Sequence, residues 1–160
     1  MAPRIIVRLA VETDGPVIAK FNALMALETE HRTLDHAILR SGVEAVLRDP
    51  AKGLYYVAEI NGTVVGQLMI TYEWSDWRNG TFWWIQSVYV TEEYRGKGVF
   101  KTLFRFIEQE ARKKEDVCGL RLYVEKANER AKKTYEQVGM SMTAYELLEI
   151  DFVLNKPEDH

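Results

Sequence analysis

Basic residues and glycines alternate in a short segment that follows an apolar run, a combination suited to binding phosphate. The segment reads Val88-Tyr89-Val90-Thr91-Glu92-Glu93-Tyr94-Arg95-Gly96-Lys97-Gly98-Val99-Phe100. Glycine lets the backbone approach a ligand closely, and the first amides of a following helix lack partners within that helix. These amides and the positive end of the helix dipole favour an anion, and Arg95, Lys97 and Lys101 add positive charge. The segment therefore predicts a phosphate-binding turn.

Two common nucleotide-binding signatures do not fit this turn. The dinucleotide fingerprint requires a third glycine where Lys101 stands. The P-loop requires a glycine directly before its lysine, at the position of Phe100. Taken alone, the turn has a purely structural interpretation as an alternative.

A second motif follows about thirty residues later and favours a functional interpretation of the turn over a purely structural one. The stretch 128–140 places five residues in a fixed order and spacing: Asn128, Ala131, Tyr135, Gly139 and Met140. Together the two motifs resemble the GNAT superfamily of acyl-CoA-dependent N-acetyltransferases. In that family the turn begins with Arg or Gln and has a central glycine, which correspond to Arg95 and Gly98. The family prefers a small residue at the position of Phe100.

The resemblance extends from Ile5 to about Phe152, nearly the whole chain. There is also a looser likeness to the polyamine and diamine acetyltransferase branch, in the stretch 21–50, the loop 74–80 and Tyr94-Arg95-Gly96. The family implies acetyl-CoA as the cofactor. The residues expected to contact it are Val88, Tyr89, Val90, Arg95, Gly96, Lys97, Gly98, Val99, Phe100, Lys101, Asn128 and Tyr135.

The same resemblance implies a catalytic role for Tyr135, as the acid that protonates the leaving thiolate. The acceptor is expected to be a primary amine, which must lose a proton before it attacks. The polyamine branch has a glutamate near the amine, but Gln86 stands at that position here and is not a base. Glu30 is our first choice as its replacement, and Glu28, Glu73 or a water held by Gln86 are alternatives.

The expected activity is thus acetyl transfer from acetyl-CoA to an amine, by direct attack. A small polyamine-like molecule, an aminoglycoside, an amino acid and a protein amino group all stay open as acceptors, and acyl chain length is open too. Gln86 and Phe100 motivate an alternative, a non-catalytic acyl-CoA sensor or interaction domain with the same fold.

Composition limits the class of protein, the partners and the cellular location that are expected for this activity. The chain has 160 residues, 47% hydrophobic and 28% charged, which is typical of one globular domain. A net charge of −3 argues against a nucleic-acid partner, and no apolar stretch reaches the length of a membrane span. With one cysteine and no signal-peptide pattern, a cytoplasmic location is expected. His31 and His36 lack metal-ligand spacing, so no metal site is expected.

Hydrophobic periodicity and turn signals predict the elements that position these residues. Strands are expected at 5–9, 54–60, 63–72, 82–90, 120–124 and 145–154, with Asn61-Gly62 as a tight hairpin turn. Helices are expected from Thr13 to Glu28, from Ser41 to Asp49, from the glycine turn to about Ala111, and from Asn128 to Val138. This order predicts a single α+β domain, with a mixed, mostly antiparallel central sheet flanked by about four helices.

The domain is expected to cover residues 1–154, followed by a loose tail at 155–160. Leu147 and Leu148 lie in the expected last strand, whose exposed face is a candidate homodimer contact.

Overall fold

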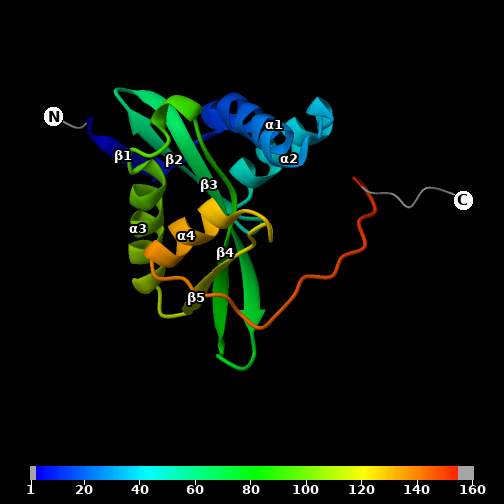
Figure 1. The fold of residues 1–160 in the computed structure, drawn as a ribbon, viewed down its shortest axis with the longest axis vertical. Coiled ribbons are helices and arrows are strands. Elements are labelled where there is room, and N and C mark those ends of the chain that lie inside the picture. Colours follow the sequence, from blue (N-terminus) through cyan, green and yellow to red (C-terminus); the bar gives the residue numbers. More distant parts are fainter. Residues whose placement is uncertain (1–2, 155–160) are drawn as a thin grey trace, which may run out of the picture. The chain divides into compact units, whose positions relative to one another are not determined.

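The computed structural model describes residues 3–154, so the expected tail at 155–160 lies outside the described residues. Four α-helices and five strands occur in the described range (Figure 1). In chain order they are β1 (Ile5–Leu9), α1 (Gly15–Glu30), α2 (His36–Arg48), β2 (Leu54–Ile60), β3 (Thr63–Ser75), β4 (Gly80–Val90), α3 (Val99–Arg112), β5 (Val117–Leu122) and α4 (Glu129–Gln137). Single 3₁₀ turns occur at Glu12–Asp14 and Glu92–Tyr94.

The chain forms two compact units, Met1–Glu125 and Lys126–His160. The first contains a sheet with the strand order β1-β2-β3-β4-β5. Its first three pairings are antiparallel and the β4–β5 pairing is parallel. This confirms the predicted α+β class with a mixed, mostly antiparallel sheet. The hairpin turn is also as predicted, because Asn61 and Gly62 both have positive φ, 51° and 78°.

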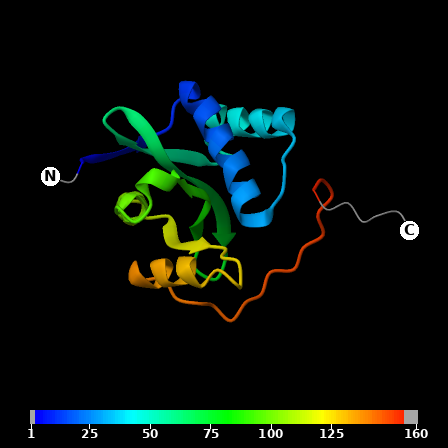
Figure 2. The same ribbon diagram turned by 45° about the horizontal axis from the view of Figure 1, so that its top comes forward.

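The helices of the first unit cover both faces of its sheet (Figure 2). Tyr55 and Val57 of β2 pack with Ile18 of α1 and Val43 of α2 in one buried cluster. The residue between them, Tyr56, places its ring 5.8 Å from that of Phe106 in α3. Because neighbouring strand residues face opposite sides, α1 and α2 lie on one face and α3 on the other. Strand β2 therefore runs between two packed layers.

Helix α2 begins five residues before its predicted start. The sequence Ser41-Gly42-Val43-Glu44 was expected to cap it, but Ser41 and Gly42 lie inside the helix. The observed cap is Asp35, whose Oδ1 accepts a hydrogen bond of 3.0 Å from the Ile38 amide. An aspartate at that position satisfies an amide that would otherwise lack a partner, so the helix extends back to it.

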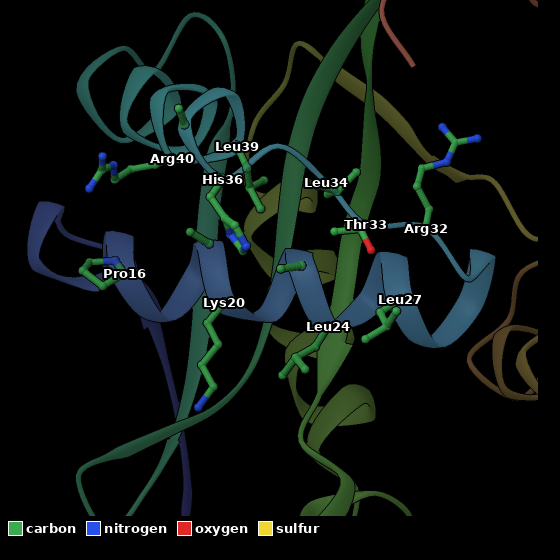
Figure 3. A pocket seen from close by; sticks show the side chains of 13 residues that line it. Pro16, Lys20, Leu24, Leu27, Arg32, Thr33, Leu34, His36, Leu39 and Arg40 are labelled. Carbon is green, nitrogen blue, oxygen red and sulfur yellow. The ribbon is translucent and has the colours of Figure 1, made fainter. Parts of the chain in front are cut away.

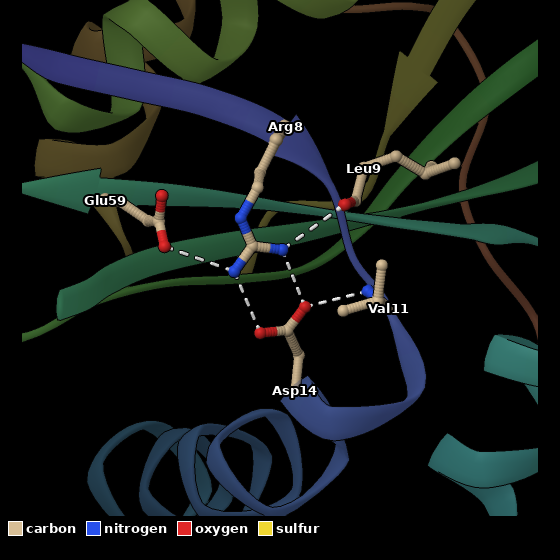
Figure 4. Close-up of polar contacts among 5 residues, drawn as sticks. All are labelled: Arg8, Leu9, Val11, Asp14 and Glu59. Carbon is tan, nitrogen blue, oxygen red and sulfur yellow. Dashed lines mark hydrogen bonds and ion pairs between the residues drawn. The ribbon is translucent and has the colours of Figure 1, made fainter. Parts of the chain in front are cut away.

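A charged cluster ties β1 to the entrance of α1 (Figure 4). The Arg8 guanidinium donates to both carboxylate oxygens of Asp14, at 2.7 and 3.0 Å, and to Glu59 at 3.2 Å. The Asp14 carboxylate also accepts the Val11 amide at 2.7 Å. Asp14 is buried, and the hydrogen bonds from Arg8 hold the pKa of its carboxyl below the ordinary value. The ionised carboxylate therefore stabilises the folded state.

The substitution Asp14→Asn should lower the free energy of unfolding by about 1–3 kcal/mol at pH 7, because it removes a charge-assisted bond to Arg8. The stabilising contribution of the Asp14 carboxylate is fully present above the pKa of about 3.9 that it has in the unfolded chain. It is lost as the pH falls through the lower pKa that the carboxyl has in the folded protein. Urea unfolding at pH 7 and at about pH 2 should show the gap between wild type and variant closing in acid. Asp76→Asn, at an exposed turn, is the control. An equal gap at both pH values would contradict the assignment.

The second unit contains α4 and an extended segment. Asn128 caps α4 by accepting the Ala131 amide at 3.0 Å, and Gly139 ends it with a φ of 99°, as predicted. The predicted strand at 145–154 is wrong, because no strand forms there. A strand requires a partner for its backbone, and α4 is the only regular element described in this unit. Leu147 and Leu148 of this segment are exposed.

Within residues 3–154, no helix is long and apolar enough to span a bilayer. No group of three or more His, Cys, Asp or Glu side chains is placed to bind a metal ion in that range.

Candidate active site

Strand β4 extends beyond the end of its parallel neighbour, β5. The pairing with β5 ends at Ile85 and Leu122, while β4 continues to Val90. On the other side of β4 the ladder to β3 goes on, and the Thr91 amide donates to the Val65 carbonyl at 2.9 Å. Antiparallel pairing alternates, so the peptide groups of Val90 point away from β3. The end of β4 thus presents backbone hydrogen-bonding groups along an edge that β5 does not cover.

A β-bulge lies in this uncovered part of β4. Gln86 is paired with Met69 and Tyr89 with Gln67, so Ser87 and Val88 together oppose one residue of β3. Ser87 has a φ of 51°, a left-handed conformation that costs a non-glycine residue about 1–2 kcal/mol. The bulge bends the strand and sets the direction of the backbone that follows it.

The glycine turn comes directly after this strand and begins α3. Gly96 and Gly98 have φ values of 76° and 83°, and Gly98 is the N-cap of the helix. Apart from the glycine and its chain neighbours, no heavy atom of residues 3–154 lies within 4 Å of the position that a Cβ would occupy on either glycine. The first bond inside the helix runs from the Thr102 amide to the Gly98 carbonyl, so the amides of residues 99–101 precede the helical ladder. The turn is an open cradle at a positive helix end.

Phe100 does not close this cradle. Its ring lies 6.1 Å from that of Phe104, one turn along α3, and the residue is half-buried. The side chain packs along the helix, while its amide stays at the first turn. The large residue at this position is therefore compatible with an anion at the helix end.

Arg95, the first residue of the turn, is held by the surrounding protein. Its Nε donates to the Val90 carbonyl at 2.9 Å, and its Nη2 lies 3.1 and 3.3 Å from the two carboxylate oxygens of Glu28. The guanidinium also lies 5.3 Å from the centre of the Tyr89 ring. Burial and a hydrogen bond to Glu28 raise the pKa of Tyr89. Arg95 thus connects the turn to the last turn of α1.

The two lysines of the turn are less constrained. Lys97 lies 5.4 Å from the centre of the Tyr94 ring, and both Lys97 and Lys101 are exposed. Long exposed ammonium side chains can follow a bound phosphate, and they supply the mobile charge of the site.

The residues considered as bases differ in their surroundings. Gln86 is half-buried and donates to the Thr71 hydroxyl, and Glu30 is exposed at the end of α1. Glu73 accepts from Arg121 at 2.6 Å and from the Trp84 indole at 3.1 Å. The bond from Arg121 is the first cause of the lowered pKa of Glu73, which makes Glu73 a weaker base.

Asn128 and Tyr135 belong to the second unit. Asn128 is the N-cap of α4, and Tyr135 lies within the helix, seven residues further along the chain. Burial raises the pKa of the Tyr135 phenol above its ordinary value. The first unit therefore brings together the end of β4 and the glycine turn, and the second places Asn128 at the start of the helix that contains Tyr135.

Comparisons with known proteins agree with this geometry. The model of the acetyltransferase (GNAT) family matches residues 21–140, three quarters of the chain. The chain belongs to the GNAT acetyltransferase family. A possible acetyltransferase from Clostridium difficile 630 is 50% identical, with a TM-score of 0.86, over 92% of this chain and 97% of that one. No curated protein matches the sequence significantly.

Two more distant structures share the GNAT fold. A predicted acetyltransferase from Clostridium acetobutylicum, described with acetyl-CoA, is 17% identical, with a TM-score of 0.74, over 93% of this chain and 97% of that one. A ribosomal-protein-alanine N-acetyltransferase from Brucella melitensis is 21% identical, with a TM-score of 0.75, over 93% and 99%. The protein is an acyl-CoA-dependent transferase, and acetyl-CoA is its co-substrate.

One groove of the first unit lies between α1 and α2, with a volume of about 730 Å³ (Figure 3). Its basic residues are Lys20, Arg32, His36 and Arg40, and no carboxylate is among its thirteen lining residues. None of the residues predicted for the GNAT site lines it. It therefore offers neither the cradle nor the acid that acetyl transfer requires.

Sequence reasoning missed a set of buried polar residues behind β4. Gln67 is fully buried, and its amide nitrogen donates to Asn22 at 2.8 Å and to the Ser87 carbonyl at 3.1 Å. Asn22 in turn donates to the Tyr55 hydroxyl at 3.2 Å. One signal was available, because Gln67 interrupts the apolar run of β3 with an amide.

Proposed function

We propose that this GNAT protein transfers the acetyl group of acetyl-CoA to a primary amine by direct attack. The observation that carries the proposal is the uncovered end of β4 leading into the open glycine cradle at the start of α3. Amides of Val99 and Phe100, with Lys97 and Lys101, would hold the pyrophosphate, and the peptide groups of Val88 and Val90 would hold the pantetheine arm.

The amine nitrogen attacks the thioester carbonyl carbon, the carbon–sulfur bond breaks, and the amine gives up a proton. An alkyl ammonium with a pKa of about 10.4 is neutral in roughly one molecule of 2,500 at pH 7, so deprotonation is part of the barrier. The paired Glu73 is a poor base and Glu28 is ion-paired with Arg95, which leaves Glu30 or a water held by Gln86 for this role.

Tyr135 is the proposed acid for the departing thiolate. A phenol with a raised pKa keeps its proton at neutral pH and delivers it as negative charge develops on sulfur. Asn128, at the cap of the same helix, is proposed to contact the cofactor arm.

Calorimetry with acetyl-CoA, followed by a screen of primary amines with thiol release as the readout, tests the proposal. We expect saturable binding with one site per chain and release of free thiol that depends on the amine. Absence of binding would refute the proposal. Binding with no release beyond hydrolysis, for polyamines, amino acids, aminoglycosides and peptides alike, would favour the acyl-CoA sensor.

A further inference from the structure

The bulge in β4 has a buried support of its own. Ser87 holds a φ of 51°, and its carbonyl accepts the Gln67 amide nitrogen at 3.1 Å. The same nitrogen donates to Asn22 of α1 at 2.8 Å. One amide group of β3 thus connects the bulge to the first helix, and a displacement of Gln67 would release both.

Packing alone does not account for a glutamine here. Gln67 is 0% exposed, and its Oε1 has no hydrogen-bond partner within residues 3–154. Burying an amide with an unpaired oxygen is unfavourable, and the flanking Val65 and Leu68 show that the strand accommodates apolar residues at full burial. The two donor bonds are what the amide contributes that an apolar side chain would not.

The position of the bulge links these bonds to the site. Ser87 and Val88 form the bulge, and Val90 follows within the part of β4 that β5 does not cover. The direction of the Val88 and Val90 peptide groups therefore depends on how the Ser87 peptide is held. The glycine turn begins five residues after Val90 and has its own support in the bond from Arg95 to the Val90 carbonyl and in the ion pair of Arg95 with Glu28.

We propose that Gln67, with Asn22 behind it, is a positioning residue that holds the Ser87 bulge and so sets the backbone that binds the pantetheine arm of acetyl-CoA. The inference rests on the proposed function. It predicts that the Gln67 amide affects the binding of the arm, while the glycine turn determines the binding of the phosphates. The affinity for a ligand without the arm should therefore not depend on Gln67.

The test compares two ligands by calorimetry, acetyl-CoA and adenosine 3′,5′-bisphosphate, which carries the 3′-phosphate and the first phosphate of the pyrophosphate without the arm. Gln67→Met keeps the length of the side chain and removes its donors. We expect its dissociation constant for acetyl-CoA to rise about tenfold, while that for the bisphosphate stays within about twofold. Ile60→Ala, almost as buried at 2% exposed but paired with Thr63 at the hairpin end of β2, is the control for general loosening of the core, and both of its affinities should stay close to those of wild type.

A rescue variant separates positioning from stability. Adding Ser87→Gly to Gln67→Met removes the backbone cost of the positive φ, so the double variant should recover part of the acetyl-CoA affinity. If Gln67→Met does not fold, Ser87→Val perturbs the bulge from the other side and should show the same selective loss.

The two proposals fail in different ways. Wild-type protein that binds no acetyl-CoA would remove the proposed function. Wild-type binding with an unchanged acetyl-CoA affinity in Gln67→Met, or with equal losses for the two ligands, would overturn the role of Gln67 alone.

Discussion

Replacing Tyr135 by phenylalanine should lower kcat about 100-fold and change the dissociation constant for acetyl-CoA by less than about twofold. The substitution deletes one oxygen, so the ring keeps its packing and only the proton donor is lost. Burial holds the pKa of the phenol above its ordinary value of about 10, and wild-type activity should show no decline from its ionisation below that pH. Single-turnover measurements isolate the chemical step from product release.

Tyr145→Phe is the matched control, because this tyrosine lies in the same unit and is 74% exposed. Its kcat should equal that of wild type. Equal single-turnover rates for Tyr135→Phe and wild type would show that the phenol is not the acid. A large loss of acetyl-CoA affinity would show that the phenol acts in cofactor binding instead.

The substitution Gly98→Val should raise the dissociation constant for acetyl-CoA about 10- to 100-fold. A β-branched residue strongly disfavours a φ of 83°, so the turn must leave the conformation that directs the amides of Val99 and Phe100 outward. There is space for a side chain, since beyond the chain neighbours no atom of the described residues lies within 4 Å of the Cβ position. The protein should therefore fold, and the loss should appear in ligand binding.

Gly62→Val gives the same backbone perturbation at another place. Gly62 has a φ of 78° and an equally open Cβ position, but it lies in the β2–β3 hairpin. Its stability should fall by an amount similar to that of Gly98→Val, and its acetyl-CoA affinity should match wild type. Calorimetry measures the acetyl-CoA affinity of both variants and urea unfolding measures their stability, which separates backbone strain from loss of binding. Equal acetyl-CoA affinities in the two variants would contradict the role of the glycine turn in binding phosphate.

The features that sequence predicted correctly are those that local chemistry determines. Asn61-Gly62 specifies its hairpin because few other residue pairs accept two positive φ values. The glycine turn and the cap at Gly139 follow from the same preference, and α3 follows from its apolar face.

Features that depend on partners distant in sequence were not predictable. The bulge at Ser87 arises from the register of β4 against β3, and a single strand sequence does not contain that register. The Arg95–Glu28 pair joins residues 67 positions apart. The segment 145–154 has a strand-like composition, but composition does not supply a neighbouring strand.

The Arg95–Glu28 pair has a consequence for ionic strength. Its opposite charges lie 3.1 Å apart, so Arg95 brings little net charge to an incoming polyanion. Attraction at long range then depends on Lys97 and Lys101, which dissolved ions screen beyond about 8 Å at physiological salt. Hydrogen bonds from the amides at the start of α3 act at contact, inside that distance. Salt in the medium should therefore slow the capture of acetyl-CoA more than it hastens its escape.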